Sequence, residues 1–387
     1  MKRMKIAVAT HFPADPGAPR GGVEAVSVNL VRALADFDDL ELHVVTLDRS
    51  VPEPVQGYWE KVAVHRLPRP AGSELLGAIG PGRRLVSGFL GRLAPDLVHA
   101  HDTYGLMVKG LRIPRVFTIH GFIYGDTLVS GVRMPWLRSQ IWRLIETSGW
   151  ADQPHIISIS PYVRERLAGI ARGVIHDIDN PISEAFFRLP RQDQGNIVFC
   201  AAAICPRKNT LRLVEATARL VQQGVDVKLR LAGAVTEPEY GRRVHQAVSD
   251  YRLRDKVMFL GQIGTERVKQ ELSSASVFAL VSLEENSPMG IEEAMAARVP
   301  VVTSNRCGMP YMVRDGESGF LVNPHDVADI ASRLAQILGD ADLRRRLGDK
   351  SHAIALDRFH PGPVAARTRG VYFDAIHRAA VLAGDDG

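Results

Sequence analysis

Short apolar runs alternate with longer amphipathic segments along the whole chain of 387 residues. Before residue 180, the apolar runs of strand length lie at 5–10, 42–47, 62–67, 97–100, 116–119, 156–159 and 174–178. A helix is expected from Gly21 and Gly22 to about Asp36, and further helical segments separate several of the later runs. Strands that are apolar throughout are typical of a parallel sheet covered on both faces. This half of the chain therefore predicts an α/β domain.

The segment 180–196 is polar and contains Pro181, Pro190 and Gly195, which predicts a linker. The alternation then restarts, with strands expected at 197–203, 227–232, 257–260, 277–281 and 299–303 and helices at 211–222 and 239–251. Residues 325–357 read as mostly helical. Pro361 and Pro363 are expected to break the chain before a last helix at about 364–382.

Two series of strand–helix units joined by one linker predict the fold class: two Rossmann-like, doubly wound domains that face a deep cleft. The expected domains are 1–180 and 196–360, and a helix within 361–387 is expected to return to the first domain. In such sheets, ligands bind beyond the carboxyl ends of the strands.

Composition adds limits on partners and location. Residues 1–195 carry 23 Lys and Arg against 20 Asp and Glu, and the remainder carries 25 against 23, so the net charge of +5 is spread evenly. An even spread argues against a nucleic-acid interface. Cys200, Cys205 and Cys307 lack zinc or redox spacing. No apolar stretch approaches the ~20 residues of a spanning helix. We expect a cytoplasmic protein, with any membrane contact peripheral and at the inner face.

Two features of the first half are candidates for ligand binding. Gly21 and Gly22 stand between the first strand and its helix, where the backbone and free N–H groups suit a phosphate. An ordinary glycine-containing loop is the alternative. His120 follows the strand at 116–119, which favours a place in the cleft, and a structural histidine is the alternative.

Arg207 and Lys208 follow the first strand of the second half, at the turn into a helix. A cationic pair at such a turn can bind a pyrophosphate, and each charge-assisted contact contributes about 1.5–3 kcal/mol. The alternative is a solvated basic turn in which Asn209 caps the next helix.

The most informative segment is 282–295, which reads Ser-Leu-Glu-Glu-Asn-Ser-Pro-Met-Gly-Ile-Glu-Glu-Ala-Met. Glu285 and Glu293 have seven residues between them, and Gly290 is expected to mark the turn that separates them. This spacing can direct two carboxylates and several backbone N–H groups at one ligand. A carboxylate suits paired sugar hydroxyls because it accepts hydrogen bonds from both. An acidic helix cap is the alternative.

These segments resemble the retaining GT-B glycosyltransferases of glycosyltransferase family 4 (glycosyl transferases group 1), whose signature is Glu-x7-Glu ending in Glu-Ala-Met. The similarity continues through 296–303, Gly308-Met-Pro310 and 315–322. The resemblance implies a hexosyltransferase that retains anomeric configuration. It would move a hexose or N-acetylhexosamine from a nucleotide-diphosphate sugar, UDP favoured over GDP, to a hydroxyl of a glycan, lipid-linked or small-molecule acceptor. The first domain would bind the acceptor and the second the donor.

The resemblance also implies roles for single residues. Gly22 would donate its N–H to the donor phosphate, and His120 would lie near the transferred sugar. Lys208 would neutralise the departing diphosphate, Glu285 would hold sugar hydroxyls and Glu293 the ribose hydroxyls. The expected catalytic residues are His120, Lys208 and Glu285. The expected donor-binding residues are Gly21, Gly22, Arg207, Lys208, Glu285, Met289, Gly290, Ile291 and Glu293. The chain has no Asp-x-Asp motif at the site, so no metal or other cofactor is expected to be obligatory.

The sequence departs from the family pattern at three positions. Ala203 stands where the family usually has Arg, and Cys307 stands where it has a Gly. Tyr311 stands where the family often has Glu. A nucleotide-sugar 2-epimerase and a non-catalytic sugar-nucleotide binding protein therefore stay open as alternatives, the latter because of Ala203.

The acceptor is expected at the loops 50–82 and 121–135 of the first domain. Basic and aromatic residues lie in or near them: Arg83, Arg84, Arg133, Arg138, Arg143, Trp136 and Trp142. They suit an anionic or lipid-linked acceptor, and ordinary amphipathic helices with solvated faces are the alternative.

Overall fold

The computed structural model describes residues 3–72, 74–129 and 134–385. These divide into two compact units. Unit 1 holds the described residues of Met1–Ile123, Gln140–Pro181 and Pro361–Gly387, and unit 2 those of Tyr124–Ser139 and Ile182–His360. Each unit is built on its own mostly or wholly parallel sheet. The predicted fold class, two Rossmann-like α/β domains, is confirmed.

The sheet of unit 1 has the strand order β3-β4-β2-β1-β5-β6-β7-β8 among the described residues. The strands are β1 (Met4–Ala9), β2 (Leu40–Asp48), β3 (Val55–Trp59), β4 (Val62–Pro68), β5 (Leu97–His101), β6 (Arg115–Ile119), β7 (His155–Ser158) and β8 (Val174–Asp177). Every residue of β5, β6 and β7 is buried, which explains why these strands read as short apolar runs. The sequence analysis missed β3, an exposed edge strand that pairs antiparallel with β4.

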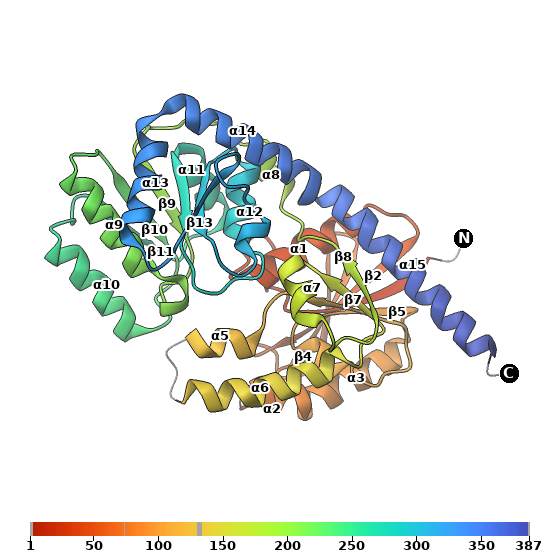
Figure 1. Ribbon diagram of the computed structural model, residues 1–387. Helices are drawn as coiled ribbons and strands as arrows, with labels where there is room; N and C mark the ends of the chain where they lie inside the picture. Colours follow the sequence, from red (N-terminus) through yellow and green to blue (C-terminus); the bar gives the residue numbers. More distant parts are fainter. Residues whose placement is uncertain (1–2, 73, 130–133, 386–387) are drawn as a thin grey trace. The chain divides into compact units, whose positions relative to one another are not determined.

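The helices that contribute to unit 1 are α1 (Gly22–Leu34), α2 (Glu74–Ile79), α3 (Pro81–Leu93), α4 (Tyr104–Met107), α6 (Pro135–Trp150), α7 (Pro161–Leu167) and α15 (Pro361–Asp385). Helix α15 packs beside α1 (Figure 1). Its Tyr372 hydroxyl lies 2.7 Å from Nδ1 of His99 on β5, and Arg369 forms an ion pair with Asp39. Pro361 is the first residue of α15, where a missing N–H costs little. The prolines therefore open this helix.

The sheet of unit 2 is wholly parallel, in the order β11-β10-β9-β12-β13-β14 among its described residues. The strands are β9 (Ile197–Ala201), β10 (Lys228–Ala232), β11 (Val257–Gly261), β12 (Val277–Leu280), β13 (Val301–Ser304) and β14 (Gly319–Val322). Because β9 and β12 are neighbours, the segments that follow these two strands emerge at the same edge of the sheet.

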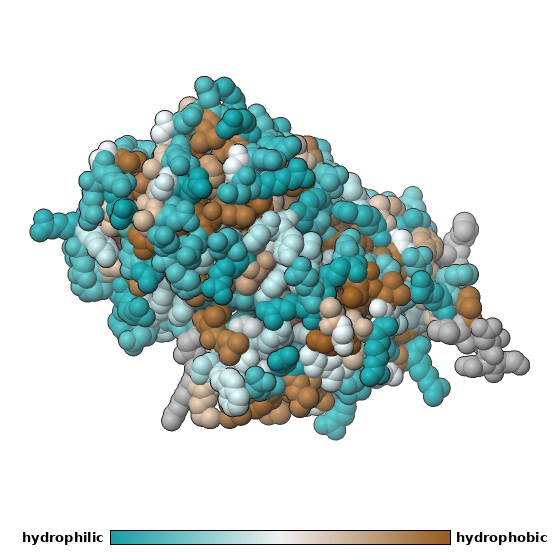
Figure 2. Space-filling model, viewed as in Figure 1, coloured by the Kyte–Doolittle hydropathy of each residue, from teal (hydrophilic) through white to brown (hydrophobic). Residues whose placement is uncertain are grey.

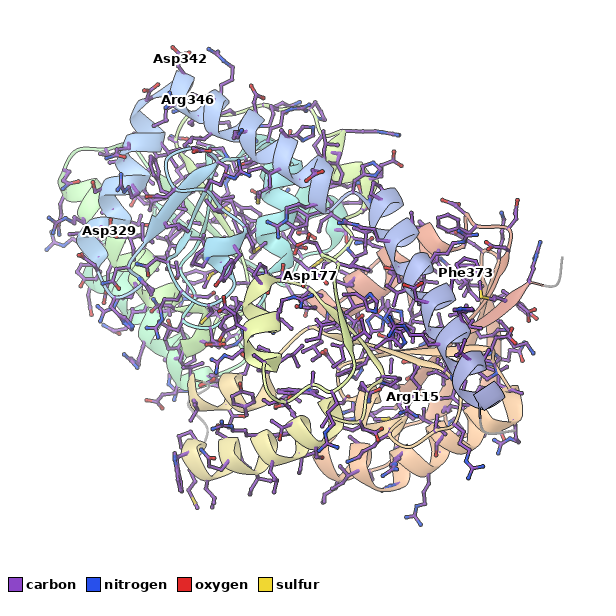
Figure 3. All side chains as sticks on the ribbon, turned by 45° about the vertical axis from the view of Figure 1, so that its right-hand side comes forward. Arg115, Asp177, Asp329, Asp342, Arg346 and Phe373 are labelled. Atoms are coloured by element: carbon purple, nitrogen blue, oxygen red, sulfur yellow. The ribbon has the colours of Figure 1, made fainter. Side chains whose placement is uncertain are left out.

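The helices of unit 2 are α8 (Glu184–Phe187), α9 (Thr210–Gln222), α10 (Pro238–Asp250), α11 (Thr265–Ser274), α12 (Met289–Ala296), α13 (Val327–Gly339) and α14 (Ala341–Arg358), with 3-10 turns η1 (Pro206–Lys208) and η2 (Met309–Tyr311). Helix α5 (Ile123–Val129) lies almost wholly in this unit. Polar residues occupy the outer faces of α13 and α14, as Asp329 on α13 and Asp342 and Arg346 on α14 illustrate (Figure 3).

Three segments are more regular than the sequence analysis expected. The predicted linker 180–196 contains α8, whose Phe186 and Phe187 belong to the core of unit 2. Besides β4, which is the strand predicted at 62–67, the expected loop 50–82 contains β3 and α2, and the expected loop 121–135 contains α5. Arg133 lies outside the described residues. No helix in the described ranges combines the length and the apolar character that crossing a membrane requires.

Candidate functional site

The candidate donor site of unit 2 is built at the carboxyl ends of β9 and β12. Strand β9 leads into η1, which carries Arg207 and Lys208, and β12 leads into the loop that carries Glu285. The backbone N–H of Leu283 donates to the carbonyl oxygen of Arg207 at 2.8 Å. This bond joins the two loops directly, so residues 77 positions apart in sequence meet at one place.

Glu285 is buried and is in contact with both cations of η1. Lys208 donates its Nζ to Oε1 of Glu285, and Nη1 of Arg207 donates to the same oxygen at 2.9 Å. Arg207 also donates to the carbonyl oxygen of Glu284 at 2.9 Å. Burial tends to raise the pKa of Glu285, but the charges of Lys208 and Arg207 outweigh it and lower this pKa below its usual value. Glu285 is therefore an ionised carboxylate at neutral pH.

Asp126 on α5 adds a second acid to this cluster. Its Oδ1 lies 3.6 Å from Nε of Arg207. Burial raises the pKa of Asp126 to about 6, while the charge of Arg207 opposes the rise and that of Glu285 adds to it. The sequence analysis missed Asp126, because no motif marks it and it lies about 80 residues before its partner.

Asn209 holds the turn that presents Lys208. Its backbone is left-handed, with φ 58°, and its side chain makes no cap of α9. Instead its Nδ2 donates to the carbonyl oxygens of Val281 and Pro324, at 3.1 and 2.8 Å. Asn209 therefore occupies the N-cap position of α9, as the alternative expected, but its side chain does not cap the helix. The side chain ties η1 to the end of β12 and so positions Lys208.

Gly308 lies directly against the loop that carries Glu285. A Cβ at this position would fall 1.7 Å from the carbonyl oxygen of Asn286, so only glycine fits. The N–H of Gly308 donates to the carbonyl oxygen of Glu285 at 2.8 Å. The neighbouring Cys307 donates its thiol to Oε2 of Glu284 at 2.9 Å. The 307–308 segment therefore supports the carboxylate loop through both backbone and side chain.

Helix α12 begins earlier than expected. Gly290 is its second residue, and Pro288 occupies the N-cap position, so the prediction that Gly290 marks the preceding turn is wrong. A Cβ at Gly290 would lie 2.9 Å from Cζ of Phe278, which shows how closely the helix start packs on the sheet. The side chain of Ile291 is fully buried and that of Met289 packs on the core. These residues can therefore offer a ligand mainly their backbone.

The two consecutive glutamates of α12 differ in their surroundings. Glu292 is fully buried and accepts a hydrogen bond from the Ser287 hydroxyl at 2.6 Å. Glu293 keeps some solvent exposure, and burial of its carboxyl raises its pKa to about 8. Glu292 therefore stabilises the loop, whereas Glu293 is the member of the pair that a ligand can reach.

In unit 1, the paired glycines stand at the start of α1. Gly21 is the N-cap residue and Gly22 the first helical residue, and both are exposed. Gly21 has an extended backbone that any residue adopts, and a Cβ there would meet nothing within 4 Å. A side chain at position 21 would therefore meet no steric obstacle in the described chain.

His120 follows β6 and belongs to a histidine pair. Its Nε2 lies 2.8 Å from Nδ1 of His101, and the two rings stack with centroids 5.0 Å apart. Its N–H donates to Oδ1 of Asp102 at 3.0 Å. Burial lowers the pKa of His120 to about 4, so the imidazole is uncharged at neutral pH. The sequence analysis missed His101, the partner that fixes the ring.

The structure thus gathers Arg207, Lys208 and Glu285 in unit 2, whereas Gly21, Gly22 and His120 belong to unit 1. Ala203 follows β9 and contributes no charge. Within the ranges that the structure describes, no group of three or more His, Cys, Asp and Glu side chains is arranged to hold a metal ion.

Comparison with known proteins gives matches along nearly the whole chain. The sequence model of "Glycosyltransferase Family 4" matches residues 20–186, and that of "Glycosyl transferases group 1" matches 181–353. The MMP α-(1→4)-mannosyltransferase of Mycolicibacterium hassiacum is 28% identical over 301 residues, covering 74% of this chain and 72% of the relative.

Solved structures agree on the fold. Sucrose-phosphate synthase from Thermosynechococcus elongatus superposes with a TM-score of 0.81 at 22% identity, over 97% of this chain and all of that chain. Anabaena HepE, in complex with UDP-glucose, superposes with a TM-score of 0.73 at 20% identity, over 96% and 100% of the two chains. The resemblance inferred from the Glu-x7-Glu segment is confirmed: the chain belongs to glycosyltransferase family 4 and has the GT-B fold.

Proposed function

We propose that this glycosyltransferase moves a hexose or N-acetylhexosamine from a nucleotide-diphosphate sugar to a hydroxyl of a glycan, lipid-linked or small-molecule acceptor, with retention of configuration. The observation that carries the proposal is the contact of buried Glu285 with Lys208 and Arg207, next to the start of α12. A UDP-sugar is the favoured donor, and the HepE complex with UDP-glucose supports this choice.

In the proposed complex, unit 2 binds the donor. Lys208 neutralises charge on the diphosphate as it departs, and the N–H of Gly290, near the start of α12, binds a phosphate oxygen. The N–H of Ile291 already donates to the carbonyl oxygen of Pro288 at 3.0 Å, so Ile291 contributes to the phosphate site less than its sequence position predicts. Glu293 accepts hydrogen bonds from the ribose hydroxyls. No metal or other cofactor is assigned, because the cation and the helix start supply the positive charge.

Glu285 has two proposed tasks. It accepts hydrogen bonds from hydroxyls of the transferred sugar, and its contact with Lys208 holds the ammonium group in place before the donor arrives. Arg207 already pairs with Glu285 and lies near Asp126. The charge of Arg207 therefore stabilises the loop that carries Glu285. Arg207 compensates only in part for the arginine that the family usually has at the position of Ala203.

The proposed reaction keeps the configuration by attack on the face from which the diphosphate leaves. The bond between the anomeric carbon and the phosphate oxygen lengthens first. The acceptor oxygen then bonds to the anomeric carbon on that same face, and its proton passes to the departing phosphate oxygen. Donors fixed before the reaction, such as Lys208, stabilise the negative charge that develops.

Unit 1 is proposed to bind the acceptor. The N–H of Gly22 would reach the donor phosphate, and neutral His120 would donate or accept a hydrogen bond at the transferred sugar rather than supply charge. A non-catalytic sugar-nucleotide binding protein is the second candidate, which the neutral Ala203 favours. Release of free sugar from the donor, with and without acceptors, separates these candidates from each other and from a 2-epimerase.

Lys208→Ala is predicted to lower the rate of transfer by about 10²–10³-fold, because one fixed donor to the departing diphosphate is lost. The variant should fold, since Arg207 still pairs with Glu285. Transfer and donor hydrolysis are measured beside circular dichroism. Lys228→Ala, at an exposed lysine of β10, is the matched control and should keep full activity. Unchanged turnover in Lys208→Ala would exclude the proposed role.

Nucleotide binding is predicted to release a proton near pH 7 through Glu293. Its pKa of about 8 keeps it mostly protonated without ligand, and hydrogen bonds from ribose hydroxyls favour the carboxylate. Titration calorimetry of UDP at pH 7, in buffers that differ in ionisation enthalpy, measures the release. It should vanish in Glu293→Gln and fade above pH 9, where the group is already ionised. Equal release by wild type and Glu293→Gln at pH 7 would contradict the assignment.

The product is predicted to have the anomeric configuration of the donor. The scalar coupling of the anomeric proton in the glycoside product, measured by NMR, distinguishes the two configurations. An inverted product would rule out same-face attack while leaving the donor site intact. The wild-type protein with an α-linked UDP-sugar is sufficient for this test.

We also propose peripheral membrane contact by α6 for a cytoplasmic protein. Trp136, Leu137, Ile141 and Leu144 of this helix are 67%, 43%, 46% and 73% exposed, and Arg138 and Arg143 lie among them. Hydrophobic side chains are visible along the edge where α6 lies (Figure 2). Exposed apolar residues beside arginines suit an anionic lipid surface.

The double variant Trp136→Ser and Leu144→Ser is predicted to co-sediment with anionic vesicles several-fold less than wild type, because apolar burial in the lipid is lost. Met258→Ser, at a 54% exposed apolar residue of β11, is the control and should bind as wild type. If the wild-type protein does not co-sediment with the vesicles, the proposed membrane contact is contradicted and α6 is an ordinary amphipathic helix.

A further inference from the structure

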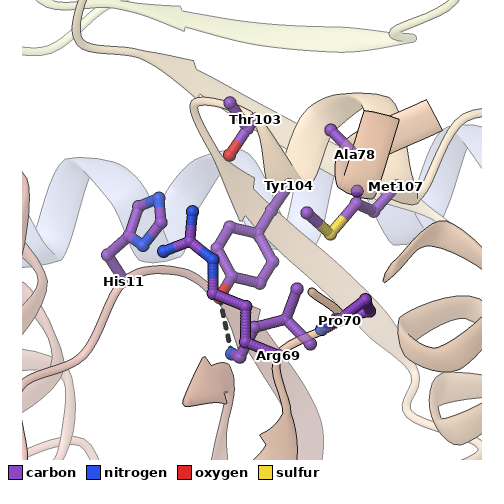
Figure 4. Close-up of a pocket in the computed structure, with 9 residues that line it drawn as sticks. His11, Arg69, Pro70, Ala78, Thr103, Tyr104 and Met107 are labelled. Atoms are coloured by element: carbon purple, nitrogen blue, oxygen red, sulfur yellow. Dashed lines mark hydrogen bonds between the residues drawn. The ribbon is translucent and has the colours of Figure 1, made fainter. Parts of the chain in front are cut away.

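The lining of one pocket in unit 1 includes none of the residues assigned to the donor. It is lined by His11, Leu47, Arg69, Pro70, Gly77, Ala78, Thr103, Tyr104 and Met107 (Figure 4). These residues come from the ends of β1, β2, β4 and β5, which are consecutive in the sheet order, and from α2 and α4. Strand β1 pairs with both β2 and β5, so the pocket lies where the chain order of the sheet reverses. Ligands of open α/β sheets bind at such positions.

Thr103 gives the pocket a buried hydroxyl whose hydrogen-bonding capacity is not satisfied within the described protein. Its side chain is 5% exposed, and its Oγ1 has no hydrogen-bond partner among the described residues. A buried hydroxyl without a partner is unfavourable. Thr103 lines the pocket, and Figure 4 shows it on the wall next to Tyr104. A ligand atom that accepts a hydrogen bond would satisfy this hydroxyl.

The other polar groups of the pocket are also donors. Arg69 follows β4 and extends between His11 and Tyr104 (Figure 4). Its backbone is fixed because its N–H donates to the carbonyl oxygen of Asp48 at 2.9 Å. His11 packs edge-on against the Tyr104 ring, with centroids 5.2 Å apart. The Tyr104 hydroxyl accepts from the N–H of Leu47 at 2.7 Å and lies 3.4 Å from the Thr46 hydroxyl.

The lining therefore selects for an anionic acceptor of hydrogen bonds. None of the nine lining residues is Asp or Glu, while guanidinium, imidazole and hydroxyl groups reach the pocket from three separate elements. Three donors from different directions suit a tetrahedral group with three terminal oxygens better than a planar carboxylate.

We propose that this pocket binds the phosphate monoester of a small phosphorylated acceptor, with Arg69 as the charged donor and the Thr103 hydroxyl as a neutral donor. The proposal rests on the proposed function, because it makes unit 1 the acceptor-binding unit of the transferase. It deepens that function by naming the class of acceptor. Lipid-linked and neutral glycan acceptors are correspondingly disfavoured.

Binding is measured by thermal shift and calorimetry of the full chain with inorganic phosphate and glycerol 3-phosphate. Neutral glycerol and the carboxylate glycerate serve as comparison probes. Arg69→Gln is expected to weaken glycerol 3-phosphate binding by about 10- to 100-fold, as loss of a charge-assisted hydrogen bond does. Arg49→Gln, at an exposed arginine after β2, is the matched control and should bind as wild type. Glycerate binding with no phosphate binding would overturn the proposal.

Thr103→Val gives a second test that does not depend on Arg69. Valine has nearly the same shape, and it removes a hydroxyl that has no partner in the described protein. The variant should melt at or above the wild-type temperature, while its affinity for glycerol 3-phosphate falls by about 2- to 10-fold. A lower melting temperature with unchanged affinity would show that the hydroxyl serves the fold and would overturn its assignment as a ligand donor.

The donor site is measured separately in the same variants. Arg69→Gln and Thr103→Val should keep the wild-type stabilisation by UDP, because they lie outside unit 2. If the wild-type protein does not bind UDP, the proposed function is contradicted. If it binds UDP but not phosphate, only the proposal for the pocket is contradicted.

Discussion

The contact between one buried carboxylate and two cations is the constraint on which the structure of unit 2 depends. Glu285 is ionised inside the protein, and such a charge is tolerated because Lys208 and Arg207 both donate to it. Removing both cations would leave Glu285 as an uncompensated buried charge, a change that commonly costs about 3–5 kcal/mol. The loops after β9 and β12 must therefore keep their mutual position within hydrogen-bonding distance.

The surrounding backbone is arranged to keep that position. Asn209 adopts a left-handed conformation so that its amide reaches carbonyl oxygens of two other loops. Gly308 approaches Asn286 more closely than any side chain would permit. Both features place backbone strain or steric limits next to the same carboxylate. Such concentration of backbone constraints is typical of functional sites.

The sequence predicted the buried parts of the fold because strands covered on both faces are mostly apolar. The prediction from sequence failed for elements that are not covered on both faces or that are very short. Strand β3 is an exposed edge and carries no apolar run, and α8 is a single turn hidden in a polar segment. In the site, Glu285 and Lys208 were recognisable from their spacing and setting. Asp126 and Asn209 act through partners 81 and 72 residues or more away, so no local pattern marks them.

The replacement of the family's usual arginine by Ala203 changes which groups can stabilise a diphosphate. The charge that a family member usually places there is absent, and the nearby Arg207 is already engaged with Glu285, the Glu284 carbonyl and Asp126. A cation that neutralises protein carboxylates supplies less field to a ligand than one facing it. In the proposed function, Lys208 and the start of α12 therefore carry most of the stabilisation of a departing diphosphate. Asp126 adds to this effect. Its pKa of about 6 leaves it largely ionised at neutral pH, so its negative charge offsets a further part of the positive charge of Arg207.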